Sequence, residues 1–131
     1  MIVVDASVLA NAIGDDGADG NRARTALAHQ DLSAPDLVDV ETVSVLRKRW
    51  LTRTITTRRF ATAIDDLQSF PIDRCPALAL MRRAYELRAN VTAYDAAYIA
   101  LAELLGCALV TADARLARAP GIRCPVTILT L

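Results

Sequence analysis

Two acidic residues of this chain stand where α/β proteins usually place reactive side chains. Asp5 ends the apolar segment 2–4, and Asp113 follows the apolar segment 108–110 by two residues. Ligands of open parallel sheets bind beyond the carboxyl ends of the strands, so we expect both aspartates at a binding edge. Taken alone, each is more typical of a helix N-cap. No glycine follows Asp5 closely, which excludes a GxGxxG dinucleotide site or a P-loop there.

Two further acids lie in segments with helical patterns. Val38, Glu41 and Val45 fall on one face of a helix, so Glu41 interrupts an apolar stripe. An ionised carboxylate there is costly unless it binds a cation or pairs with a group such as an arginine. Asp95 follows Thr92 at the spacing of a capping box, which taken alone is the favoured interpretation of that residue.

The four acids together indicate a site that none of them indicates alone. Four carboxylates at one end of a sheet cannot all stay ionised without a counter-charge. Hard divalent cations that prefer oxygen ligands, Mg²⁺ or Mn²⁺, supply that charge. Ser7 and Thr111 lie beside the strand-end aspartates. They are placed to orient a ligand or a water molecule, and a plain capping or turn role is an equal alternative.

The elements that must position these acids alternate along the chain. β-Branched apolar runs indicate buried strands, and Ala- and Leu-rich segments indicate helices. This alternation predicts an α/β fold, a three-layer sandwich with a central, mostly parallel sheet of four to five strands. The helix at 93–105 is apolar almost all round, so we expect it to be central. The predicted strands are 1–5, 32–34, 71–75, 108–111 and 126–129; the predicted helices are 6–13, 21–30, 36–51, 57–70, 77–88, 92–105 and 114–119; residues 14–20 are a predicted loop.

Composition bounds the class of protein. The length of 131 residues predicts a single domain spanning 1–131, and 53% hydrophobic content excludes general disorder. We expect neither a membrane span nor a signal peptide, and therefore a cytoplasmic location. The three cysteines lack CxxC spacing, which indicates reduced, mostly buried thiols. The single histidine, His29, is expected on the surface, which disfavours a histidine-based mechanism.

The net charge of zero conceals two opposed segments. Residues 1–46 carry eight acids and two bases, whereas residues 47–59 carry six bases and no acid. Neutrality excludes a uniformly basic nucleic-acid coat but not a local patch. The basic residues either solvate a helix end or contact the phosphates of a nucleic acid. Trp50, within this segment, is interpreted as a core or dimer contact rather than a base-stacking residue. The candidate phosphate-contacting residues are Arg47, Lys48, Arg49 and Arg53, followed by Arg58 and Arg59.

The ordered set of motifs resembles a known family. The motifs are Val-Val-Asp5-Ala-Ser-Val-Leu, the helical Glu41 with a basic tail, Ala93-Tyr-Asp95-Ala-Ala-Tyr-Ile-Ala-Leu-Ala and Leu109-Val-Thr-Ala-Asp113-Ala-Arg-Leu. Together they resemble PIN-domain ribonucleases, and among these the VapC toxins of bacterial type II toxin–antitoxin systems. The resemblance covers essentially the whole chain.

The resemblance implies a function and a set of partners. It implies that Asp5, Glu41, Asp95 and Asp113 form a metal-binding catalytic site of an Mg²⁺- or Mn²⁺-dependent endoribonuclease. It also implies a cognate antitoxin and a homodimer, with apolar helix surface near Trp50 or Tyr98 as candidate contacts. Arg115 stands where many relatives carry a further acid, so the number of metal ions stays open. The alternative is a PIN-like binding or regulatory module with little or no catalysis.

Overall fold

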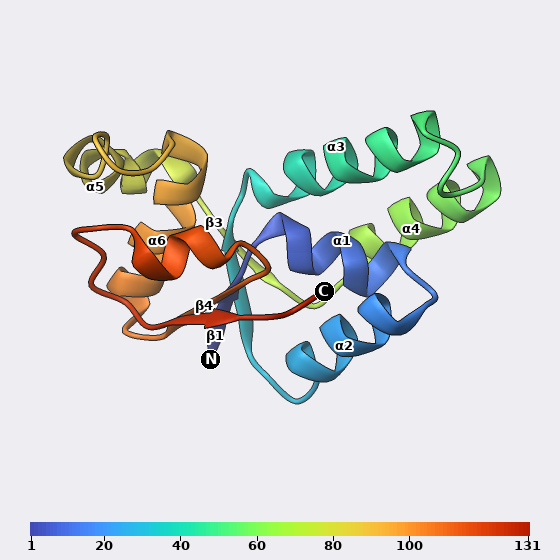
Figure 1. Ribbon diagram of the computed structural model, residues 1–131, viewed down its shortest axis with the longest axis horizontal. Helices are drawn as coiled ribbons and strands as arrows, with labels where there is room; N and C mark the ends of the chain where they lie inside the picture. The colour runs from blue at the N-terminus through green and yellow to red at the C-terminus, as the bar shows by residue number, and fades with distance from the viewer.

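A five-stranded parallel sheet forms the centre of the computed structural model, which describes residues 1–131 (Figure 1). The strand order is β3-β2-β1-β4-β5, and every neighbouring pair runs parallel, as predicted. β1 lies in the middle, with Val3 opposite Ser33 of β2 and Leu109 of β4. The strands are β1 (Ile2–Val4), β2 (Leu32–Pro35), β3 (Asp73–Cys75), β4 (Ala108–Thr111) and β5 (Val126–Ile128).

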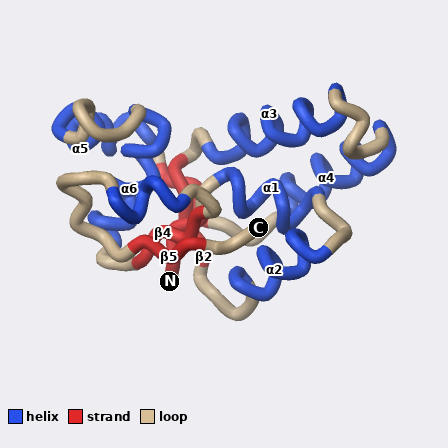
Figure 2. Tube along the Cα trace, viewed as in Figure 1, coloured by secondary structure: helices blue, strands red, loops and turns tan.

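Helices cover both faces of the sheet, so the predicted three-layer sandwich is confirmed. α5 and α6 lie on one side of the strands, and α1 to α4 lie on the other (Figures 1 and 2). The helices are α1 (Ala6–Gly14), α2 (Ala18–Leu27), α3 (Val38–Leu51), α4 (Thr57–Ser69), α5 (Met81–Glu86) and α6 (Ala93–Leu105). The 3₁₀ turns are η1 (Ala77–Leu80) and η2 (Ala114–Arg118). No helix is both long and apolar enough to cross a membrane.

The core lies where the sheet meets α1 and α6. Val3, Val4 and Leu109 of the central strands are almost fully buried. Every residue from Ala96 to Ala102 is also buried, which confirms the central position expected for this helix. Gly106 ends α6 in the left-handed conformation that a glycine adopts without a steric cost.

The predicted loop at 14–20 is wrong over its second half. α2 begins at Ala18, so the connection to α1 is only three residues long. Gly20 is buried inside α2, and a Cβ at this position would stand 1.8 Å from the backbone oxygen of Asp15. The glycine is therefore present because two backbones approach closely, not because the chain turns there.

The bounds of four further predicted elements also need correction. β2 includes Pro35 because β1 pairs only as far as Ser33, so the missing N–H of the proline removes no bond to β1. α3 starts at Val38 because Asp36 stays outside the helix, where its carboxylate accepts a hydrogen bond from the backbone N–H of Ala77 (3.1 Å). The predicted helices 77–88 and 114–119 are shortened to η1 with α5 and to η2.

Predictions about individual surface residues had mixed outcomes. His29 is exposed, as expected, although it lies just beyond the end of α2 with a positive φ of 61°. The cysteines are free but half-buried rather than mostly buried. Trp50 is 41% exposed, so it is not a core residue; its ring N–H donates to the Thr57 hydroxyl (3.0 Å) and ties α3 to α4.

Candidate active site

The four predicted acids meet at the carboxyl end of the central strands. Asp5 follows β1 and Asp113 follows the adjacent β4, so neighbouring parallel strands bring them to the same edge. Glu41 and Asp95 come from the first turns of α3 and α6. All four line one cleft of about 520 Å³, together with Ser7, Val40, Ser44, Val45, Tyr94 and Tyr98.

The Asp5 carboxylate is fixed by hydroxyl groups on both of its oxygens. Its Oδ1 accepts hydrogen bonds from the Ser7 hydroxyl (2.6 Å) and the Val8 backbone N–H (3.2 Å), and its Oδ2 accepts from the Thr111 hydroxyl. The Thr111 hydroxyl also accepts from the backbone N–H of Asp113 (3.0 Å). The two supporting residues suggested by sequence therefore hold the strand-end acids in place.

Tyr98 is a site residue that sequence reasoning missed. Exposed apolar surface was expected near Trp50 or Tyr98, but Tyr98 itself is only 3% exposed and is not part of such a surface. Its hydroxyl instead donates to Glu41 Oε1 at 2.7 Å, across the space between α6 and α3. The signal in the sequence was its position: Tyr98 follows Asp95 by three residues, which places both on one face of the helix.

The remaining two acids have local partners. The backbone N–H of Asp95 donates to the Thr92 hydroxyl (3.2 Å), the contact expected between an N-cap and the third helical residue. Asp113 caps η2 and forms an ion pair with Arg115 at 2.6 Å, where the arginine side chain is 84% exposed. Both capping interpretations therefore hold, and both acids still line the cleft.

The surroundings of three of the four cleft carboxylates disfavour their ionised form. Burial raises the pKa of Asp5, Glu41 and Asp95. The neighbouring carboxylates raise the pKa further: Asp95 and Asp5 act on Glu41, and Asp113 and Asp5 act on Asp95. Asp113 is the exception, because its hydrogen bonds to Arg115 lower its pKa. A cation is the group that relieves repulsion of this kind between carboxylates.

The donor set fits a hard divalent ion that keeps part of its water shell. No three of these side chains stand close enough together to hold one ion by themselves. Mg²⁺ in proteins is usually held by one or two carboxylates, with several waters completing its octahedral shell. The cleft offers such carboxylates, which are partly buried and repel one another.

A model of the PIN domain matches residues 2–122 of the chain. The chain belongs to the PIN-domain family. It is 41% identical to the ribonuclease VapC9 of Mycobacterium tuberculosis and to a VapC ribonuclease of Mycobacterium bovis, over 98% of each chain. The ribonuclease VapC1 of M. tuberculosis is 37% identical over 96% of both chains. The resemblance predicted from the motifs is thus confirmed.

Solved structures agree with this assignment at the level of the fold. VapC20 of M. tuberculosis, a toxin that cleaves the Sarcin-Ricin loop, has a TM-score of 0.65 and 19% identity, covering 83% of this chain and 87% of its own. PAE2754 from Pyrobaculum aerophilum has a TM-score of 0.58 and 26% identity, covering 89% of this chain and 84% of its own. The three-layer architecture is therefore that of a PIN domain.

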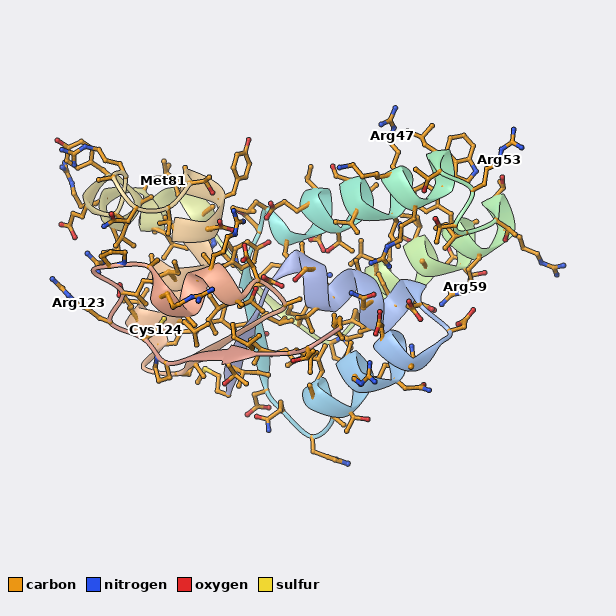
Figure 3. All side chains as sticks on the ribbon, viewed as in Figure 1. Arg47, Arg53, Arg59, Met81, Arg123 and Cys124 are labelled. Carbon is orange, nitrogen blue, oxygen red and sulfur yellow. The ribbon has the colours of Figure 1, made fainter.

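In this PIN domain the basic segment lies along the arm formed by α3 and α4. Arg47 and Arg53 point away from that arm (Figure 3), and Lys48 is exposed beside them. Arg49 differs, because its guanidinium donates to the Asn11 side chain (3.1 Å). Arg59 pairs with Asp16 (3.0 Å). The predicted patch therefore divides into exposed cations and arginines that hold α3 and α4 against α1.

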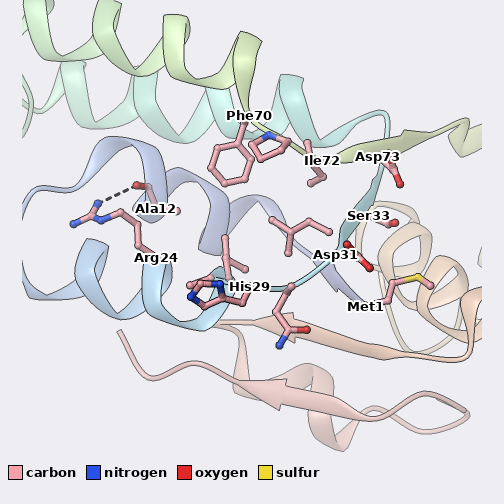
Figure 4. Close-up of a pocket in the computed structure, with 14 residues that line it drawn as sticks. Met1, Ala12, Arg24, His29, Asp31, Ser33, Phe70, Ile72 and Asp73 are labelled. Carbon is pink, nitrogen blue, oxygen red and sulfur yellow. Dashed lines mark hydrogen bonds between the residues drawn. The ribbon is translucent and has the colours of Figure 1, made fainter.

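The largest cavity of this PIN domain, about 760 Å³, lies elsewhere. It is lined by Met1, Ser33 and Asp73 at the amino-terminal side of the sheet, and by His29 (Figure 4). The acids of the cleft lie at the opposite ends of the strands. Cavity size alone therefore does not locate the proposed chemistry; the convergent carboxylates do.

Proposed function

We propose that this PIN domain is an Mg²⁺- or Mn²⁺-dependent endoribonuclease that hydrolyses RNA phosphodiester bonds as the toxin of a toxin–antitoxin pair. The observation that carries the proposal is the meeting of Asp5, Glu41, Asp95 and Asp113 in one cleft. The similarity to VapC ribonucleases over 98% of the chain supports the same activity. A binding module without catalysis would not require four carboxylates at mutual electrostatic cost.

The four carboxylates are the residues proposed to hold the metal, directly or through water. When bound, a divalent metal lowers the pKa of a water molecule and polarises the phosphoryl oxygens of the substrate. The chain contributes the orientation of the ligands: Ser7 and Thr111 restrain Asp5, and Tyr98 restrains Glu41. Outer hydrogen bonds of this kind fix the direction in which a ligand oxygen points.

Arg115 has a separate proposed role at the edge of the cleft. Its ion pair with Asp113 is largely exposed to solvent, and exposed ion pairs contribute little stability. The guanidinium could therefore leave Asp113 for an RNA phosphate, and Asp113 would then be one of the residues that hold the metal. We propose that the Arg115–Asp113 ion pair opens when the protein binds both RNA and the metal.

The partners and location follow from the same assignment. We propose that a cognate antitoxin blocks the acidic cleft, and that the protein acts in the cytoplasm on cellular RNA. We also propose a homodimer that uses exposed apolar surface near Trp50 and Leu51, which are 41% and 53% exposed. Co-purification with the product of the neighbouring gene tests the antitoxin, and sedimentation of the purified chain tests the dimer.

Asparagine substitutions at the acids test the catalytic proposal. Asp5→Asn and Asp95→Asn each preserve side-chain size but remove a charge, so Mg²⁺-dependent cleavage of total RNA should be abolished while the circular dichroism spectrum stays unchanged. Asp65→Asn, on the exposed face of α4, is the matched control and should cleave like the wild type. Equal cleavage by the wild type and both site variants would show that the acidic cleft is not the catalytic centre.

A further inference from the structure

The acidic cleft has an exposed apolar rim. Tyr94 of α6 is 63% exposed and Val40 of α3 is 71% exposed, and both line the cleft that holds the four carboxylates. These side chains come from the two helices that also supply Asp95 and Glu41. What distinguishes these two exposed apolar side chains from the others on the surface is their position at the acidic cleft, where a bound molecule can contact them.

The three tyrosines of the chain have different surroundings. Tyr98 is buried and its hydroxyl is hydrogen-bonded to Glu41. Tyr85 is exposed, but the guanidinium groups of Arg88 and Arg82 lie 4.1 Å and 5.7 Å from the centre of its ring. Tyr94 has neither a side-chain hydrogen bond nor a cation–π partner. It is the tyrosine whose ring remains available at the cleft.

We infer that Tyr94 is a stacking platform for an unpaired base next to the scissile phosphate, with Val40 on the opposite wall. The inference rests on the proposed ribonuclease function and adds a specificity-determining residue to it. Tyr94 and Asp95 line the same cleft, so a phosphate held at the acidic cluster brings an adjacent base to the tyrosine ring. Every base has a π-face, so stacking selects unpaired nucleotides rather than one sequence.

When no antitoxin covers the cleft, its chemistry fits RNA that binds together with a metal ion. The floor of the cleft carries four carboxylates that repel one another, so the cleft needs a compensating positive charge. A divalent metal ion would supply that charge, and a phosphodiester held beside the metal would bring a neighbouring base to the rim. A base inside a duplex is stacked on both faces and cannot reach Tyr94 without leaving its helix. The inference therefore includes a preference for single-stranded RNA.

Steady-state kinetics of matched tyrosine variants test the inference. The probe is a short RNA spanning a cleavage site that the wild-type protein produces in total RNA, measured with Mg²⁺. Tyr94→Ala should raise KM roughly 5- to 100-fold with little change in kcat, as expected when one base no longer stacks on an aromatic ring. Tyr94→Phe should behave like the wild type, because the ring rather than the hydroxyl makes the contact. Tyr85→Ala is the control and should leave both constants unchanged.

An abasic scan of the same RNA identifies the stacked nucleotide. Removing the base that contacts Tyr94 should raise KM for the wild type but should have no further effect on Tyr94→Ala. Such non-additivity between a protein change and an RNA change reports direct contact. Annealing the probe to its complement should abolish cleavage by the wild type.

The possible outcomes separate the two proposals. Absence of Mg²⁺-dependent cleavage by the wild type would overturn the proposed function, and the inference with it. Wild-type cleavage with an unchanged KM in Tyr94→Ala, or additive effects at every abasic position, would overturn the inference alone. A change of oligomeric state in Tyr94→Ala, with KM unaffected, would assign the rim to a protein contact instead.

Discussion

Asp5 caps α1 and lines the acidic cleft at the same time. Its Oδ1 accepts the hydrogen bond from the Val8 N–H that an N-cap requires, while Oδ2 is held by Thr111. Asp113 likewise caps η2 from within the cleft. Capping and ligand binding are compatible because a carboxylate has two oxygens with several acceptor positions. The geometry therefore allows each aspartate to cap a helix and to face the cleft, so the two roles do not exclude each other.

Tyr98 provides a direct test of how the Glu41 carboxylate is positioned. Tyr98→Phe removes only the hydroxyl that donates to Glu41, so we expect the fold to persist. Apparent Mg²⁺ affinity or activity should fall roughly 10- to 100-fold, the usual cost of removing an outer-sphere partner of a metal ligand. Titration of cleavage against Mg²⁺ measures this, with Tyr85→Phe as the control. Identical Mg²⁺ curves for wild type and Tyr98→Phe would contradict the positioning role.

The raised pKa of Glu41 predicts how stability of the metal-free protein depends on pH. Burial and the charges of Asp95 and Asp5 raise this pKa above the value of 4.5 expected in the unfolded chain. The contribution of Glu41 to stability is therefore greatest below pH 4.5 and is lost as the pH rises through the raised pKa. Glu41→Gln should abolish this loss and raise Tm at pH 7 in EDTA by about 2–5 °C, a typical gain when a functional residue is replaced.

Thermal melts of wild type and Glu41→Gln between pH 4 and pH 8 measure this difference. Added Mg²⁺ should stabilise the wild type more than the variant, because the variant lacks one proposed ligand. A Tm difference between the two proteins that does not change with pH would contradict the assigned cause.

At the scale of elements, α2 shows how packing overrides local preference. Glycine and aspartate are frequent in residues 14–20, which is typical of a loop, yet the chain is helical from Ala18. Arg24 stabilises the short connection: its guanidinium donates to the backbone oxygens of Ala12 and Asp15, both at 2.9 Å. The close approach that this arrangement requires leaves no room for a Cβ at Gly20.

Gly20→Ala separates helix propensity from packing. Propensity alone predicts a gain of roughly 0.5–1 kcal/mol on replacing a helical glycine with alanine. The clash with the Asp15 carbonyl instead predicts a net loss of about 1–3 kcal/mol, the usual cost of overpacking. Chemical denaturation measures the sign, and Thr25→Ala at an exposed position of α2 serves as the control, expected to be neutral or slightly stabilising. A more stable Gly20→Ala protein would refute the close approach.

For the whole molecule, the zero net charge is the sum of two separated fields. The carboxylates meet at the cleft, and the exposed cations lie along the α3–α4 arm. Arg47 follows Glu41 by six residues, which corresponds to about 9 Å along the helix axis. Phosphate-attracting charge thus lies within a few nucleotides of the acidic site, which reduces the repulsion that an RNA would meet there.

Salt dependence of RNA binding tests the role of the arm. Changing Arg47, Lys48 and Arg53 together to alanine should weaken binding of single-stranded RNA and lower the slope of log K against log salt by about 0.7 for each phosphate that the variant no longer neutralises. Fluorescence anisotropy at several salt concentrations measures the slope. Arg118→Ala, an exposed arginine outside the arm, is the control. An unchanged slope in the triple variant would show that these cations only solvate the arm.

The sequence by itself determined the elements, the parallel sheet and the identity of the four acids. Hydrophobic runs and caps are local features of the sequence. Parallel strands with alternating helices permit few topologies, so Asp5 and Asp113 were expected at the same edge of the sheet. The tertiary structure decided what depends on distant segments. It buried Tyr98 against Glu41, divided the basic segment between structural and exposed arginines, and closed α2 onto α1 at Gly20. Each of these contacts joins residues on different elements, and local patterns do not encode the distance between elements.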